Sequence, residues 1–261
     1  MISFSNERIR LRRAIAQIDR QTAWVLISAG LLVFLHRAIG SRMFFREYLV
    51  DLFPEYWQGV LAWTWWFAIK GVVGFIIPVA ILVLIFNRRP RDIGLGLGDL
   101  RFARVVLLVY VPIVAVGTWI LSADGDFQSS YPHYRGAAND WTLLLVYEAS
   151  YLLYWVGWEY LWRGFVLFGT APAFGVGAIV IQMVPFALLH AGKPATEAYL
   201  SILGGLALGV LVWRCRSFWI AVPIHAFQML MLDYWCTLRA RSGSEGIGLD
   251  ALVEAFGGIA G

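Results

Sequence analysis

Apolar stretches recur along the whole chain, and most are long enough to cross a membrane. They cover residues 22–35, 57–86, 105–121, 141–170, 174–190, 199–213 and 218–235. The apolar positions run continuously instead of alternating, so the segments are expected to be helices and not barrel strands. The pattern predicts an all-α, polytopic membrane protein with about seven transmembrane helices, forming one membrane domain over residues 1–261.

The segments outside these stretches are polar or only weakly apolar. Residues 1–20 interleave arginines with isoleucine and leucine, a pattern typical of a basic amphipathic helix that lies on an anionic membrane surface. Residues 37–57 are predicted to form a polar, aromatic-rich connection. Residues 239–261 are Gly-rich and weakly amphipathic, and no role is assigned to this tail.

Composition and charge agree with a membrane location. Hydrophobic residues make up 60% of the chain and charged residues 15%, which is outside the range of ordinary soluble domains. The net charge of +4 does not indicate nucleic-acid binding, because the basic residues lie at the ends of apolar stretches. Arginines before residue 22, in 88–104 and at 214 and 216 should therefore share the cytoplasmic side. We expect an integral protein of a bacterial cytoplasmic membrane with a cytoplasmic N-terminus and membrane lipids as partners.

Two opposite charges stand close together inside the stretch 141–170. Glu159 and Arg163 are four residues apart, so they share one face of a helix and can form an ion pair. A charge at the centre of a membrane helix costs roughly 2.5–3.5 kcal/mol, so such residues usually pair and usually serve a function. A purely structural ion pair that fixes helix packing is the alternative.

Two histidines lie at compatible depths in later apolar stretches. His190 ends the stretch 174–190, and His225 lies within 218–235, so both can meet Glu159 in one half of the bundle. A carboxylate and two imidazoles can polarise a water molecule and stabilise an oxyanion. Glu159, His190 and His225 could instead bind zinc, but the helical His-Glu-x-x-His signature is absent and the histidines come from different helices. A metal-free site without a cofactor is therefore preferred.

The order of these motifs resembles the CPBP (Abi) family of intramembrane glutamate endopeptidases, which includes the CAAX prenyl endopeptidases and the bacteriocin-processing enzymes. The resemblance covers residues 148–233 and rests on Glu-x-x-x-Arg-Gly from Glu159, on Phe-x-x-x-His ending at His190, and on His225. It implies that residues 141–235 form the catalytic helices. It also implies that Glu159, Arg163, His190 and His225 are the catalytic residues.

The sequence departs from the family pattern at two positions. The family's first motif begins with two glutamates, and Trp158 replaces the first of them, which acts as general base in the family. Met229 replaces the family's Asn, four residues after His225. Either Glu159 takes over as base or hydrolysis has been lost. Glu148 is a third candidate for the base, but it lies ~16 Å upstream along the helix at 1.5 Å per residue.

Three functions are consistent with these residues. The first is an intramembrane endopeptidase that cleaves a membrane-anchored or prenylated protein by means of a Glu159-activated water. The second is a catalytically inactive relative that serves as a membrane scaffold or binds a membrane peptide. The third is a proton-coupled transporter, although the chain has neither an inverted repeat nor the paired broken helices of such folds.

Overall fold

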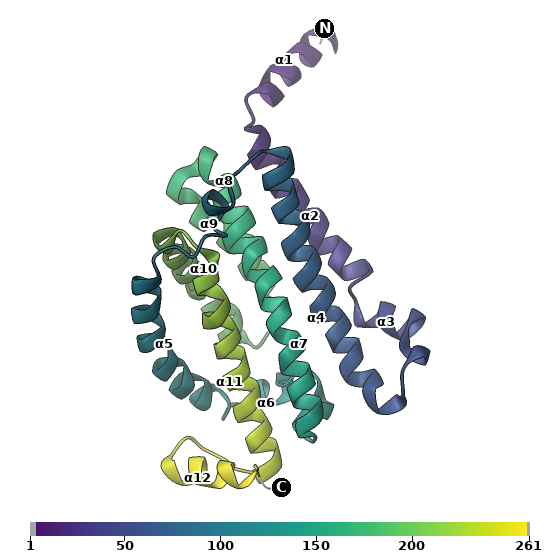
Figure 1. Cartoon of the computed structure of the whole chain (residues 1–261), viewed down its shortest axis with the longest axis vertical. Coiled ribbons are helices and arrows are strands. Elements are labelled where there is room, and N and C mark those ends of the chain that lie inside the picture. The colour runs from purple at the N-terminus through teal and green to yellow at the C-terminus, as the bar shows by residue number, and fades with distance from the viewer. Residues whose placement is uncertain (1–3, 260–261) are drawn as a thin grey trace.

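The computed structural model describes residues 4–259, and this range contains helices but no strand (Figure 1). The α-helices are α1 (Phe4–Ala16), α2 (Arg20–Ala38), α3 (Arg42–Tyr48), α4 (Glu55–Ala80), α5 (Leu100–Leu121), α6 (Gly125–Ser130), α7 (Trp141–Glu159), α8 (Leu167–Phe174), α9 (Ala178–Leu188), α10 (Ala195–Cys215), α11 (Ala221–Ser242) and α12 (Leu249–Gly257). Two π-helical turns, η2 (Ile81–Ile85) and η5 (Tyr160–Val166), continue α4 and α7. Short 3₁₀ turns are η1 (Val50–Leu52), η3 (Pro90–Ile93), η4 (Arg135–Ala138), η6 (Gly175–Gly177) and η7 (Phe218–Ile220).

The prediction of an all-α, polytopic membrane protein is confirmed. Within residues 4–259, five segments are long and apolar enough to cross a membrane, namely Arg20–Ala38, Glu55–Ile85, Leu100–Leu121, Trp141–Leu188 and Ala195–Cys215. The segment Trp141–Leu188 holds α7, η5, α8 and α9. Helix α11 is not among the five, because His225, Gln228 and Asp233 make it less apolar than its neighbours.

Helices α4 and α7 run in the same direction and pack closely against each other (Figure 1). Trp63 faces Tyr147 near the start of the pair, and Phe75 faces Tyr160 near its end. The closest approach lies between Gly71 and Gly157, where a Cβ atom on Gly157 would overlap the carbonyl oxygen of Gly71. Small residues at such crossings let two backbones approach within van der Waals distance, which is how membrane helices commonly associate.

Replacing Gly157 by Ala is expected to destabilise the protein by about 1–3 kcal/mol, because the added methyl group must push two helix backbones apart. The measurement is the thermal unfolding midpoint in detergent. Gly117→Ala on α5 is the matched control, since nothing lies within 4 Å of a Cβ at that position. An unchanged midpoint for Gly157→Ala would show that the α4–α7 contact does not depend on this glycine.

The arginine-rich segments gather at one end of the bundle. The Arg88 guanidinium donates to Gln21 at the start of α2 at 2.6 Å, and Arg214 at the end of α10 pairs with Asp99 at 3.2 Å. Helix α1 projects from this same end, clear of the other helices (Figure 1). The segments predicted to share one membrane side are therefore neighbours in space.

Several boundaries differ from the sequence-based expectations. The stretch 174–190 was expected to be a full crossing, but α9 has eleven residues and a length of roughly 16 Å, about half of a hydrocarbon core. The connection 37–57 contains α3, and the connection after α5 contains α6. The stretch 141–170 is not one regular helix, because its geometry changes at η5, directly after Glu159.

The C-terminal tail, to which no role was assigned, contains α12 and covers one end of the bundle (Figure 1). Ala251 and Ala255 of α12 pack with Trp119 and Trp235 in a small second hydrophobic cluster. The Trp119 indole N–H donates to the carbonyl of Ile247 at 2.9 Å. The tail therefore packs against the end of the bundle, which its glycine content did not indicate.

Candidate active site

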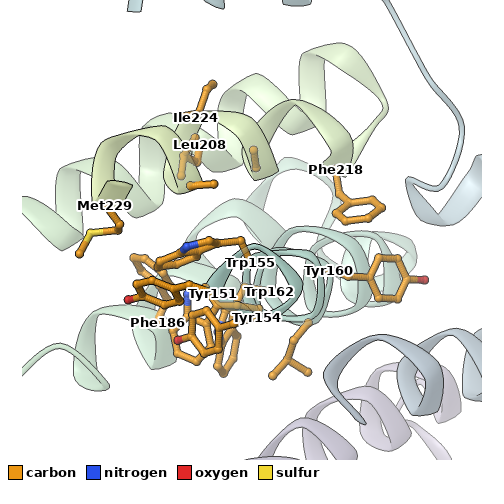
Figure 2. Packing of buried hydrophobic residues seen from close by; sticks show 14 of the residues in the cluster. Tyr151, Tyr154, Trp155, Tyr160, Trp162, Phe186, Leu208, Phe218, Ile224 and Met229 are labelled. Atoms are coloured by element: carbon orange, nitrogen blue, oxygen red, sulfur yellow. The ribbon is translucent and has the colours of Figure 1, made fainter. Parts of the chain in front are cut away.

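The central element of the site is the junction between α7 and the π-helical turn η5. Asp140 caps the start of α7 by accepting hydrogen bonds from the backbone N–H groups of Thr142 and Leu143, at 2.8 and 3.1 Å. The helix then runs to Glu159, and η5 follows over Tyr160–Val166. A π-helical turn accommodates an extra residue in the helix, and such turns occur frequently at functional sites. Figure 2 shows the aromatic side chains gathered around this junction, among them Trp155, Trp162 and Phe186.

Glu159 and Arg163 form the ion pair that the spacing predicted. Arg163 Nη1 lies 3.2 Å from Glu159 Oε1, and both side chains are fully buried. The guanidinium carbon lies 3.9 Å from the centre of the Phe186 ring, a cation–π contact between η5 and α9. Nε and Nη2 of Arg163 have no hydrogen-bond partner among the described residues. The acid is therefore the main group that neutralises this buried cation.

His225 of α11 contacts the same carboxylate. Its Nδ1 atom lies 2.6 Å from Glu159 Oε1. An ionised carboxylate can only accept a hydrogen bond, so we assign the proton to Nδ1, which leaves a free lone pair on Nε2 of the neutral ring. The Trp155 ring lies against the imidazole with 4.1 Å between the ring centres. Glu159 and Trp155 together fix the orientation of His225.

His190 lies in the turn after α9, two residues beyond the end of the helix at Leu188. Its Nδ1 atom lies 2.7 Å from the carbonyl oxygen of Phe186, which can only accept, so His190 also carries its proton on Nδ1. The Phe186 ring lies 4.5 Å from the His190 ring and 6.1 Å from the His225 ring, measured between centres. Phe186 therefore contacts Arg163 and both imidazoles.

Two cavities meet at the histidines. The apolar cavity, about 470 Å³, lies between α5, α9, α10 and α11, and the polar cavity, about 420 Å³, lies between α2, α4, α7 and the turn after α9. Both volumes are typical of ligand pockets. Four residues line both cavities: His190, Glu197, His225 and Met229. Figure 2 shows Met229 on the α11 side of this shared wall, opposite Trp155 and Phe186.

Glu159 itself lines neither cavity. Its Oε2 atom is buried and has no hydrogen-bond partner in the part of the chain that the structure describes, and its Oε1 atom contacts Arg163 and His225. The sequence led us to expect that Glu159 contacts a water molecule directly. In the structure, His225 lies between the acid and the two cavities. A carboxylate that holds the Nδ1 proton of an imidazole raises the basicity of the opposite nitrogen, as in the carboxylate–histidine pairs of hydrolases.

The alternative zinc site was assigned to Glu159, His190 and His225. Within residues 4–259, no three side chains of His, Cys, Asp or Glu are grouped so that they could hold a metal ion. The acid is already bonded to His225 Nδ1 and to Arg163. The arrangement is that of a hydrogen-bonded pair of acid and imidazole.

The comparison with known families adds an independent finding. The type II CAAX prenyl endopeptidase Rce1-like family matches residues 140–231. This segment of the chain is therefore similar to that family, and the match does not extend to the rest of the chain. The predicted resemblance to the CPBP endopeptidases is thereby confirmed over almost the same residues. No curated protein and no solved structure matches the chain.

The Rce1-like segment extends from the cap of α7 into α11, so it contains the ion pair and both histidines. Its two departures from the family pattern both lie at the polar cavity, which is lined by Trp158 and Met229. Glu148 lies elsewhere, against Asp233 of α11, and lines neither cavity. The structure therefore does not place Glu148 on the wall that His190 and His225 share.

Sequence analysis missed two groups that line the polar cavity. Lys70 lies on α4, and its Nζ atom lies 3.6 Å from the centre of the Trp66 ring. His36 lies near the end of α2 and is buried. Both come from helices outside the Rce1-like segment, so no motif pointed to them. The one indication in the sequence was the position of Lys70 near the middle of the apolar stretch 57–86.

Proposed function

We propose that the chain is an intramembrane endopeptidase that hydrolyses a peptide bond of a membrane-anchored or prenylated protein. The observation that carries this proposal is the hydrogen-bonded series from Arg163 through Glu159 to His225, whose free nitrogen belongs to a cavity wall. The Rce1-like match supports it, because that family consists of peptidases of this kind.

In the proposed reaction, His225 is the base that meets the water molecule. Its Nε2 atom takes one proton of the water while the oxygen attacks the scissile carbonyl carbon. Glu159 stabilises the imidazolium that forms, and Arg163 holds Glu159 in place. His225 then gives the proton to the leaving amine, so that the water is divided between the two products. His190 accepts a hydrogen bond from the same water through its free Nε2 and thereby orients it.

The apolar cavity suits the lipid-like part of such a substrate. It is lined by aliphatic side chains of α5 and α10 together with Phe186 of α9. An acyl, isoprenyl or transmembrane segment that enters between α5 and α10 would reach the wall formed by His190 and His225. The reaction would need no metal ion, since the base is activated by a carboxylate.

The topology proposal places the N-terminus in the cytoplasm, because the arginine-rich end carries α1. The polar cavity is lined by Arg37 and Ser41, which lie at the opposite end of α2. The site would then open toward the outer half of the membrane. This position favours a substrate whose cleavage point lies just outside the membrane.

The second candidate function is a catalytically inactive protein that binds a membrane peptide. Met229 favours it, because this apolar side chain lines both cavities at the position where the family has an amide. Such a protein would retain a single-span partner in a pull-down but would release no fragment.

Replacing His190 by Ala is expected to lower kcat/KM for cleavage of a single-span or prenylated peptide by about 10²-fold, the lower end of the range for acid–base groups. The measurement is fragment release by purified protein in nanodiscs. Leu188→Ala, an exposed position at the end of the same helix, is the matched control and should keep full activity.

Two outcomes would contradict the proposed mechanism. Equal turnover by wild type and His190→Ala would remove His190 from the mechanism. Loss of wild-type activity with a metal chelator, restored by zinc, would replace the metal-free mechanism with a metal-dependent one.

A further inference from the structure

The side chains of α12 fall into three sectors around the helix axis. At 100° per residue, the sectors are roughly 120° apart. The first sector, Ala251 and Ala255, is buried in the second hydrophobic cluster at the end of the bundle. The second sector, Asp250 and Glu254, is exposed and carries two negative charges. Two sides of the helix therefore have clear surroundings, which are protein for the alanines and water for the acids.

The third sector of α12 is apolar and exposed. Leu249, Val253 and Phe256 lie within about 60° of one another. Their exposed fractions are 79%, 73% and 44%. Single exposed apolar residues are normal on any protein surface, but a contiguous stripe of them marks a site of contact with a membrane or a partner. This apolar sector therefore indicates an apolar environment beside the tail.

The position of α12 coincides with a group of aromatic side chains at one end of the bundle. The helix lies across this end, opposite the end from which α1 projects (Figure 1). Trp119 ends α5 and stacks edge-on against Trp235 of α11, which in turn contacts Phe256 with 6.0 Å between the ring centres. Trp141 begins α7 at the same end, where the Arg241 guanidinium of α11 lies 4.7 Å from its ring. Tryptophan is enriched where a membrane meets water, so α12 lies at such a boundary.

The exposed apolar surface of α5 leads to the tail. Exposed aliphatic side chains occur along this membrane-spanning helix from Val105 to Ile120. Trp119, next to Ile120, donates to the carbonyl of Ile247, whose side chain is exposed as well. The surface that α5 presents to lipid therefore continues to the residues directly before α12.

We propose that α12 is an interfacial anchor whose apolar sector, Leu249, Val253 and Phe256, enters the acyl-chain region of the bilayer. The buried alanines hold the helix on the bundle and the acids remain in water, so the helix lies in the plane of the interface. The acidic sector gains nothing from anionic headgroups, so this anchor depends on apolar burial. This inference does not depend on the proposed endopeptidase function.

A second copy of the chain is a poorer occupant of the apolar sector. Each partner of a stable protein complex buries roughly 800 Å². The apolar sector offers three side chains on a helix of nine residues, which cannot supply such an area. A bilayer needs no matching protein surface and covers the sector together with the exposed face of α5.

The experiment attaches a nitroxide spin label to Leu249→Cys, Val253→Cys or Glu254→Cys in phosphatidylcholine nanodiscs. Molecular oxygen, which concentrates among acyl chains, should relax the labels at 249 and 253, and a water-soluble nickel chelate should not. Power saturation should place these two labels roughly 5–10 Å inside the boundary between headgroups and acyl chains. The label at 254 is the matched control on the acidic sector, and it should be relaxed mainly by the nickel chelate.

The unmutated chain reports background labelling, because Cys215 and Cys236 are both buried. Each labelled protein should keep the thermal unfolding midpoint of the unmutated chain, since all three labelled positions are exposed. Equal access of the nickel chelate to labels 253 and 254 would mean that the apolar sector faces water, and would overturn the proposal. Protection of label 253 from both reagents, with spin–spin broadening, would overturn it in favour of a second copy of the chain.

Discussion

Glu159→Gln is expected to lower kcat for peptide cleavage by about 10³–10⁴-fold, a loss comparable to that seen when a triad carboxylate becomes an amide. Glutamine has nearly the same shape, so the packing around α7 and η5 is kept. It has no charge, however, and cannot stabilise the imidazolium that His225 becomes when Nε2 takes a proton. The amide can also donate to Nδ1 and move the ring proton to Nε2, where it blocks the base.

The measurement is single-turnover cleavage in nanodiscs together with the thermal unfolding midpoint. Glu254→Gln on the exposed face of α12 makes the same chemical change far from the site and should leave kcat unchanged. Glu159→Asp keeps the charge with a shorter side chain and should retain more activity than Glu159→Gln. Full turnover by a correctly folded Glu159→Gln protein would exclude the Glu159–His225 pair from catalysis.

Arg163→Met is expected to destabilise the protein by about 3–5 kcal/mol, because it leaves the fully buried carboxylate of Glu159 without its cation. The cation–π contact with Phe186 is lost as well. The double variant Glu159→Gln/Arg163→Met should recover much of this stability, since replacing both members of a buried pair is often neutral. Denaturant or thermal unfolding of the wild type, the two single variants and the double variant completes a double-mutant cycle.

Arg214→Met is the control for that cycle. It breaks the exposed pair with Asp99 at the surface of the bundle and should change stability little. An Arg163→Met protein as stable as the wild type would mean that the carboxylate binds a proton or water instead of the arginine. A double variant no more stable than Arg163→Met would show that the cost comes from packing and not from the charge.

The elements that could be predicted from the sequence are those set by spacing along one helix. Glu159 and Arg163 are an i,i+4 pair, and this local rule holds even though η5 begins between them. Apolar length pointed to each of the five segments of residues 4–259 that are long and apolar enough to cross a membrane, but it also counted 174–190 and 218–235 as full crossings. The meeting of His225 with Glu159 required a long-range contact, for which the order of the family motifs was the only guide.

Where the structure differs from the sequence-based predictions, the reasons lie outside the local sequence. The expected full crossing at 174–190 is a half-length helix, because the 3₁₀ turn η6 occupies Gly175–Gly177 and α9 therefore begins only at Ala178. The glycines of the tail suggested an irregular segment, yet Ala251 and Ala255 of α12 pack against the buried rings of Trp119 and Trp235 at the end of the bundle. The full burial of Glu159 could not be predicted from the sequence, because burial depth, which decides whether an acid contacts water, is set by packing between helices.

The π-helical turn also matters when this chain is compared with others. It contains one residue more than a regular helix of the same rise, so every side chain after Val166 is rotated by about 100° relative to the phase of α7. A relative with an uninterrupted α-helix would align correctly on both sides only if a single-residue gap were placed within 160–166. An alignment without this gap would pair each residue of α8 with a residue of the relative that is not its structural equivalent. Sequence differences inferred in α8 would then reflect the misalignment and not real substitutions.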